Sequence, residues 1–170
     1  MACTLTQGFQ IGCNDSSGGV VEFLIGDFGT LGAITQNASG MITTIGGSSF
    51  MYTYEAEKAT STLTENINVN RENGTRYFEQ TASYVLNKAS QEKRNEIKLL
   101  AQAKLAVIVK DKNDKYWLMG QVAGVRLDGT STTEWGTAMG DRNGYTLNFK
   151  AEEVEPMAEI DSSIVAALLA

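Results

Sequence analysis

The most regular alternation of apolar and polar residues in this chain lies in residues 60–88. On the incoming side Leu63, Glu65, Ile67 and Val69 alternate with Thr and Asn residues, and a similar alternation covers residues 77–86. Asn73-Gly74 lies between the two runs, which is a strong hairpin signal. Each run is about 10 residues long, whereas strands usually have about 5–6. We therefore predict one long β-hairpin that projects beyond its own domain and packs against another subunit.

The remaining pattern predicts shorter strands and one clear helix. Strands are expected over residues 20–25, 50–57, 105–109, 116–122 and 145–149, with one more short strand in the Gly- and Thr-rich segment 29–47. Residues 90–103 predict a helix, because Ser90 can cap its first turn and Ile97, Leu100 and Ala101 form a narrow apolar stripe. Such a stripe favours a helix that lies on a sheet surface.

Together these elements predict a mainly β (α+β) protein. The expected architecture is a β-sandwich or small barrel with one flanking α-helix and the long projecting hairpin. A length of 170 residues indicates a single domain, 1–170. Within it, the polar, Gly/Ser-rich residues 1–19 are expected to form an N-terminal arm, and residues 157–170 a C-terminal arm.

Two segments are predicted to contact other copies of the chain. The tip of the hairpin offers the exposed candidates Arg71, Glu72, Asn73, Gly74, Thr75 and Arg76. Near the end of the chain, Asp161 can cap a short helix whose apolar residues are Ile164, Val165, Leu168 and Leu169. These four must pack on the protein's own core or on a neighbour. We predict that they form an interface.

Charge and composition narrow the range of functions. The net charge is −6, from 14 Lys and Arg against 20 Asp and Glu, which disfavours a protein that grips DNA phosphates but allows a surface past which DNA slides. Histidine is absent, which removes the usual triads and most zinc sites. Cys3 and Cys13 are expected to be reduced thiols. The beginning of the sequence has no secretory-signal pattern, and no apolar run approaches the roughly 18 residues of a membrane span.

Few segments suggest chemistry. Residues 111–115 resemble the beginning of a calcium loop, but Tyr116 and Val122 stand where that loop needs Gly and Glu, so a hairpin turn is favoured. Glu152, Glu153 and Glu155 are interpreted as a solvated strand end. We expect no enzymatic activity, no catalytic or metal-binding residue and no cofactor.

Several segments resemble structural proteins of tailed bacteriophages, particularly phages of Bacteroidetes hosts. The segments that carry this resemblance are residues 1–8, 65–75, 94–100, 115–120 and 138–147. Among virion proteins, the chain is most similar to the tail tube family. The resemblance implies a single tail-tube-like domain that assembles into stacked hexameric rings around a DNA channel.

The same resemblance implies partners and a location. The partners would be further copies of the chain, other phage tail proteins, and genome DNA that passes through without specific binding; no membrane is involved. The protein would be part of the virion, assembled in the cytoplasm of the host bacterium. In a tube, the candidates for the channel wall are Glu55, Glu57, Glu65 and Glu79.

Other functions remain open at this stage. Related folds serve as tail terminators, tail-completion rings, baseplate hub rings and head-decoration proteins. A different class is a monomeric or small-oligomer binding module, such as a head-decoration protein or a receptor-binding adaptor. An enzyme with an unrecognised site is the third alternative.

Overall fold

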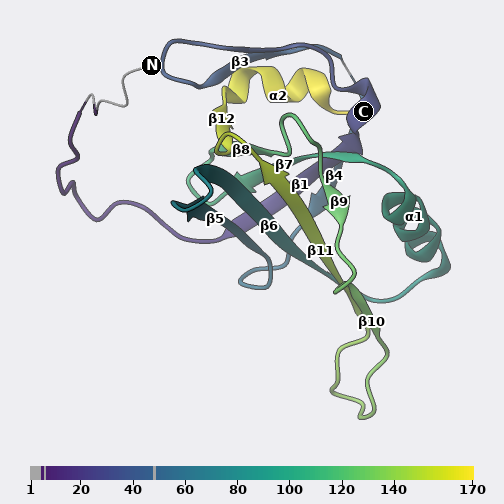
Figure 1. The fold of residues 1–170 in the computed structure, drawn as a ribbon. Helices are drawn as coiled ribbons and strands as arrows, with labels where there is room; N and C mark the ends of the chain where they lie inside the picture. Colours follow the sequence, from purple (N-terminus) through teal and green to yellow (C-terminus); the bar gives the residue numbers. More distant parts are fainter. Residues whose placement is uncertain (1–4, 6, 48) are drawn as a thin grey trace.

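Two β-sheets packed face to face form the body of the molecule (Figure 1). The computed structural model describes residue 5, residues 7–47 and residues 49–170. Sheet A has seven strands in the order β2 (Ile34–Gln36), β3 (Ile42–Ile45), β12 (Ala158–Ile160), β8 (Tyr116–Met119), β7 (Leu105–Asp111), β1 (Val20–Asp27) and β4 (Met51–Glu55). Sheet B has the order β10 (Thr132–Glu134), β11 (Gly144–Glu153), β6 (Thr75–Asn87) and β5 (Thr62–Asn70), with β9 (Arg126–Leu127) paired to β11. The mainly β prediction is confirmed, and the sheets form an open sandwich that does not close into a barrel.

The central strands of sheet A are buried on both faces. One face packs against sheet B, where Phe23 of β1 meets Tyr84 of β6 edge-to-face with ring centroids 5.2 Å apart. The opposite face packs against helix α2 (Ser162–Leu168), where Ile108 of β7 belongs to the same cluster as Leu168. A strand covered on both sides needs apolar residues at successive positions. This explains the uninterrupted apolar run at the beginning of β7.

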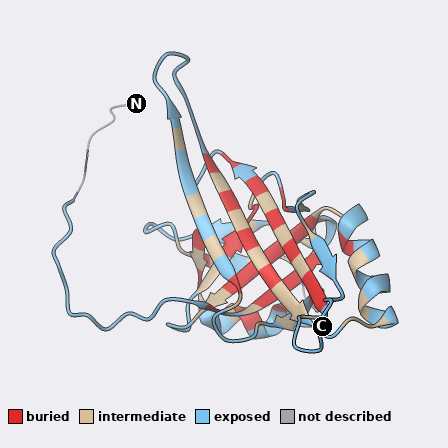
Figure 2. Cartoon of the chain, turned by 90° about the horizontal axis from the view of Figure 1, so that it is seen from below, coloured by how far each residue is buried: buried red, intermediate tan, exposed pale blue. Residues whose placement is uncertain are grey.

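Helix α1 (Gln91–Gln102) begins where the sequence predicted. Ser90 is its N-cap, and the Ser90 hydroxyl accepts a hydrogen bond from the Lys93 amide at 3.3 Å. Its buried residue, Leu100, joins the core between the sheets. We expected this helix to lie flat on a sheet surface. It lies instead beside the sandwich, at the side where β4 and the strands of sheet B separate (Figures 1 and 2).

The long hairpin forms, but most of it lies inside sheet B. Strands β5 and β6 pair from Thr62–Ser83 to Asn70–Thr75. Strand β6 also pairs with β11 as far as Phe78, opposite Glu153. Only the end of the hairpin beyond that pair extends past the rest of the sandwich (Figure 2). The expectation that the hairpin projects beyond its own domain is therefore wrong for its base.

Three further elements differ from the sequence prediction. The 3₁₀ turn η1 (Phe28–Thr30) overlaps the beginning of segment 29–47, which then forms two short strands, β2 and β3, where one was expected. Strand β11 is ten residues long and continues to Glu153. The C-terminal arm is not an arm, because β12 and α2 complete sheet A and its core.

Residues 7–19 form an extended, exposed segment that contains no helix or strand (Figure 1). Residues 1–4 and 6 of the expected N-terminal arm lie outside the described residues. Cys13 is exposed on the described segment, whereas Cys3 lies outside the described residues. Neither helix in the part of the chain that the structure describes is long and apolar enough to cross a membrane.

Candidate functional site

The tip of the hairpin is a four-residue turn held by one side chain. The Asn70 carboxamide oxygen accepts hydrogen bonds from the amides of Glu72 at 3.0 Å and Asn73 at 3.1 Å. Gly74 has φ +64°, a conformation that glycine adopts without strain. All six predicted interface residues, 71–76, are exposed. The turn therefore presents them to solvent, and their role as an interface stays a prediction.

Next to the turn, two large apolar residues are also exposed. Ile67 is opposite Phe78, and Val69 is opposite Arg76, so their side chains share the face of the ribbon that points toward sheet A. No residue that the structure describes covers this end of the face, and Ile67 and Val69 are 67% and 64% exposed. The Arg76 guanidinium lies 5.9 Å from the centre of the Phe78 ring, and Phe78 is only 7% exposed. We define Ile67 and Val69 as the tip patch.

Sequence reasoning did not single out the tip patch as an interface. The signal was present, because the alternation of Leu63 continues through Ile67 and Val69 on the same face. The candidate residues were instead chosen from the polar turn. Exposed apolar side chains on a protruding element are the more specific indication of a contact surface.

The C-terminal candidates pack mainly on their own chain. Val165 and Leu168 are 4% and 1% exposed and belong to the core under sheet A, so they have no surface to offer to a partner. Ile164 is half-buried against the same cluster, and Leu169 is 37% exposed. The sequence allowed this helix to pack on its own core or on a neighbour, and in the structure it packs on its own core.

The four channel candidates do not share one surface. Glu55 is the last residue of β4, in sheet A, and Glu57 follows just after this strand; both are exposed. Glu65 and Glu79 belong to sheet B but point to opposite faces, because Glu65 pairs with the buried Gln80 whereas Glu79 lies on the solvated side. A single subunit therefore brings no more than two of the four to a common edge.

Glu65 is engaged in a buried polar network. The side-chain amide of Gln80 donates to the Glu65 carboxylate at 3.2 Å, and its oxygen accepts from the Gly120 amide at 2.9 Å. The Met157 amide also donates to Glu65, at 2.7 Å. These bonds tie sheet B to two segments of sheet A, so this carboxylate has a structural role in the subunit.

Glu153 is a second acid with a structural role, although the sequence analysis placed it in solvent. It is 4% exposed and accepts hydrogen bonds from the amides of Val122 at 3.1 Å and Ala123 at 2.7 Å. Buried carboxylates need such donors, because burying an unpaired charge is very unfavourable. The interpretation of residues 152–155 as a solvated strand end is therefore wrong for Glu153, which closes the turn after β8.

The outward face of sheet B is mainly polar and carries both basic and acidic side chains. On it the Lys150 ammonium donates to the carboxylates of Glu79 at 2.6 Å and Glu152 at 3.3 Å. These hydrogen bonds raise the pKa of Lys150 above its ordinary value. Thr, Ser and Asn residues occupy most of the other outward positions of β5, β6 and β11, and Tyr77 and Val85 of β6 also lie on this face. This is the solvated side of an antiparallel sheet.

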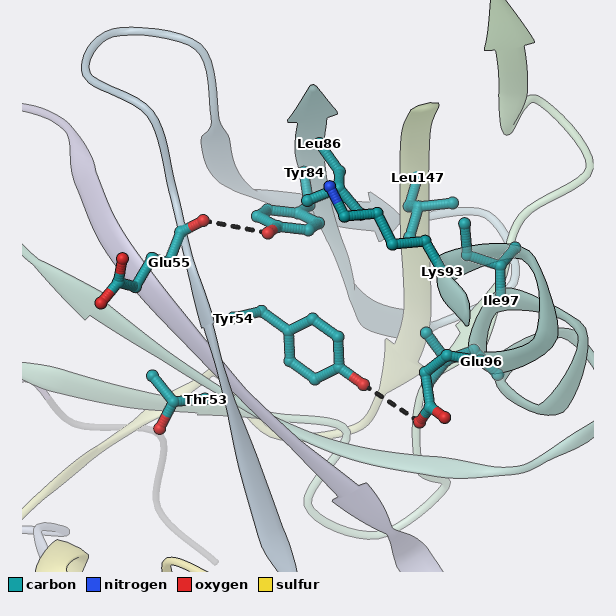
Figure 3. Close-up of a pocket in the computed structure, with 10 residues that line it drawn as sticks. Thr53, Tyr54, Glu55, Tyr84, Leu86, Lys93, Glu96, Ile97 and Leu147 are labelled. Carbon is teal, nitrogen blue, oxygen red and sulfur yellow. Dashed lines mark hydrogen bonds between the residues drawn. The ribbon is translucent and has the colours of Figure 1, made fainter. Parts of the chain in front are cut away.

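A groove of about 530 Å³ separates helix α1 from the free edge of β4 (Figure 3). Its lining is mainly apolar and comes from both sheets and the helix: Tyr54, Tyr84, Leu86, Ile97, Leu100 and Leu147. A smaller cavity of about 180 Å³ continues it along α1, since both share Tyr54, Glu96 and Leu100. The groove explains why Ile97, which belongs to the apolar stripe of the helix, is only half-buried.

Four polar side chains of this groove, those of Tyr54, Tyr84, Glu96 and Lys93, already have partners. The Tyr54 hydroxyl donates to the Glu96 carboxylate at 3.3 Å, and the Tyr84 hydroxyl donates to the Glu55 carbonyl at 2.9 Å (Figure 3). Burial and the Glu96 carboxylate raise the pKa of Tyr54, while burial and then Glu55 raise that of Tyr84. The Lys93 ammonium donates to the carbonyls of Asn87 and Lys88. Both tyrosines therefore stay neutral near pH 7, and the groove suits an uncharged apolar group.

Residues 111–115 form the hairpin turn that we predicted between β7 and β8. The Asp111 carboxylate accepts from the amides of Asn113 and Lys115 and from the Trp117 indole. In the described ranges, no three Cys, Asp or Glu side chains are grouped so that they could hold a metal ion. Comparison with protein-family models, curated proteins and solved structures finds no match to this chain.

Proposed function

We propose that this protein is a phage virion structural subunit, a tail tube protein that forms stacked hexameric rings around a DNA channel. The proposal assigns it no catalytic activity and no cofactor. Its partners are further copies of the chain, other tail proteins, and DNA that slides through the channel without specific binding. The sequence resemblance supplies the family, and the sandwich with a flanking helix and a protruding hairpin is the architecture that this family implies.

The tip patch is the observation that carries the proposal. Ile67 and Val69 stand on a ribbon that extends past its own domain, with about two thirds of each side chain in water. Each fully buried side chain of this size gains about 1.5–3 kcal/mol. A ribbon of two strands alone is only marginally stable in water. Docking on a neighbouring copy would bury the patch and support the ribbon together.

The experiment compares the full-length protein with a variant in which a two-residue turn replaces residues 68–77. The Ile67–Phe78 pair then closes the hairpin, and everything that packs in the core is kept. We expect the wild type to form rings or tubes in negative-stain images, and the variant to remain a monomer with the same far-ultraviolet spectrum. A monomeric wild type, or normal particles from the shortened variant, would overturn the proposal.

One observation favours a second virion role, that of a decoration or adaptor protein. The loop between β10 and β11 protrudes from the opposite end of sheet B (Figure 1). It carries Met139, which is fully exposed, and Trp135, which is 60% exposed beside the Arg94 guanidinium. Size in solution separates the two roles, because a decoration or adaptor module stays a monomer or small oligomer.

A further inference from the structure

The free edge of β4 can accept another strand within the groove beside α1. The Ala56 amide donates to Val21 of β1, whereas Met51 accepts from the Ala170 amide on the opposite side. Backbone groups alternate in direction along a strand, so the amide and carbonyl of Thr53 and the amide of Glu55 point away from β1. These groups face the groove that α1 borders. An open edge of this kind is a template for strand addition.

The N-terminal arm has the pattern of a strand that lacks a partner. Phe9, Ile11 and Cys13 occupy alternate positions and would share one face of an extended chain. Phe9 and Ile11 are 93% and 103% exposed. Residues 7–14 carry no charge, which matches the mainly apolar lining of the groove, where the charged side chains of Lys93 and Glu96 already have partners.

We propose that the groove between β4 and α1 receives the N-terminal arm of a second copy of this chain. The arm pairs with the edge of β4 at Thr53 and Glu55, and Phe9 and Ile11 enter the apolar groove beneath α1. This inference rests on the proposed self-assembly, for which it names one of the contacts.

The direction of the arm favours a second copy over the arm's own subunit. The Ser17 amide donates to the Asn113 side chain at 2.9 Å, and the same side chain donates back to the Ser17 carbonyl at 2.9 Å. This clamp fixes the root of the arm at the turn between β7 and β8. From there the arm leaves on the side of the molecule opposite α1 (Figure 1). At about 3.3 Å per residue, residues 5–16 can reach roughly 40 Å from that root.

Cross-linking tests the contact in the full-length protein. The photoreactive analogue p-benzoyl-phenylalanine replaces Phe9, and isotopically heavy and light copies are mixed before assembly and irradiation. We expect heavy–light cross-links from residue 9 to peptides of α1 or β4. Links only within one copy would show that the arm folds back on its own subunit. Links to any other surface of a second copy would overturn the docking site and leave self-assembly standing.

Two matched pairs of variants test the same contact. Thr53→Pro removes the edge amide and adds a ring, whereas Thr53→Val keeps the amide. Phe9→Ser with Ile11→Ser removes the apolar face of the arm, whereas Gln7→Ser with Gln10→Ser does not. We expect the first member of each pair to form at least tenfold less assembled protein than the second. For the arm variants, the melting temperature of the monomer should not change. Equal assembly within both pairs would contradict the inference, and a chain that is monomeric throughout would overturn the proposed function as well. If Thr53→Pro does not fold, the cross-links and the arm pair decide.

Discussion

Single side chains decide how α1 is held. Leu100 is buried at 6% exposure, whereas Lys98, two positions earlier, faces solvent. The cap at Ser90 and the apolar stripe were readable from the sequence because they are local. The half-burial of Ile97 was not, since it depends on a groove formed by two sheets that are distant in the sequence.

Leu100→Ala should lower the free energy of unfolding by about 2–5 kcal/mol, because it leaves a cavity between the sheets. Lys98→Ala should change it by no more than about 0.5 kcal/mol. Urea denaturation of both variants measures the difference. Equal shifts would contradict the orientation of the helix.

Asp111 should make the stability of the protein depend on pH in the acid range. Burial acts to raise the pKa of this carboxyl, but the hydrogen bonds from Lys115, Trp117 and Asn113 outweigh burial and lower the pKa below its ordinary value. A carboxyl with a lowered pKa stabilises the fold above its unfolded pKa of about 3.9, and this contribution is lost as the pH falls through the folded pKa. Thermal melting between pH 7 and pH 2.5 should therefore show a smaller loss below pH 4 for Asp111→Asn than for the wild type. The same acid dependence in both proteins would show that the turn does not hold the charged form.

Among the elements, those with local signals were predicted and those that depend on distant pairing were not. Strand β7 and the β5–β6 hairpin follow from the apolar pattern, which is strong in both. Strand β3 is short and lies in a Gly-rich segment, and it pairs with β12, more than 100 residues later. From the sequence alone, an acid such as Glu153 at the end of a strand is expected to be exposed to solvent. Its burial was not predictable, because only the fold brings its two amide donors next to it.

The C-terminal helix offers a comparison of two adjacent leucines. Leu168→Ala should cost about 2–5 kcal/mol of monomer stability, because Leu168 is 1% exposed under sheet A. Leu169→Ala should cost much less, since Leu169 is 37% exposed. Chemical denaturation of the two variants tests this. A larger effect of Leu169→Ala on assembly than on unfolding would keep the predicted interface role for that residue alone.

At the scale of the whole molecule, charge bears on the proposed channel. Six copies carry a formal charge of −36, six times −6. A wall rich in Lys and Arg would hold passing phosphates, whereas a mildly repulsive wall lets DNA slide. Salt limits that field to about 8–10 Å.

We therefore expect a net acidic lumen in a structure of the assembled ring. The four candidate acids do not meet on one subunit, because Glu55 ends β4 of sheet A, Glu57 follows that strand, and Glu65 is bonded within its own chain. Of the four candidates, Glu79 lies on the polar outward face of sheet B. A lumen dominated by Lys and Arg, or the absence of a continuous channel, would overturn the tube assignment.

Strand β6 also has a mechanical consequence. It runs without interruption from the tip of the hairpin into the core, and from Phe78 to Ser83 it is bonded to a strand on each side. A pull along β6 must therefore shear two ladders of hydrogen bonds at once, whereas a pull that peels β5 away opens one ladder a bond at a time. A neighbour that grips the tip would thus transmit tension directly to the rigid centre of the subunit, and the joint between subunits would resist stretching far better than peeling.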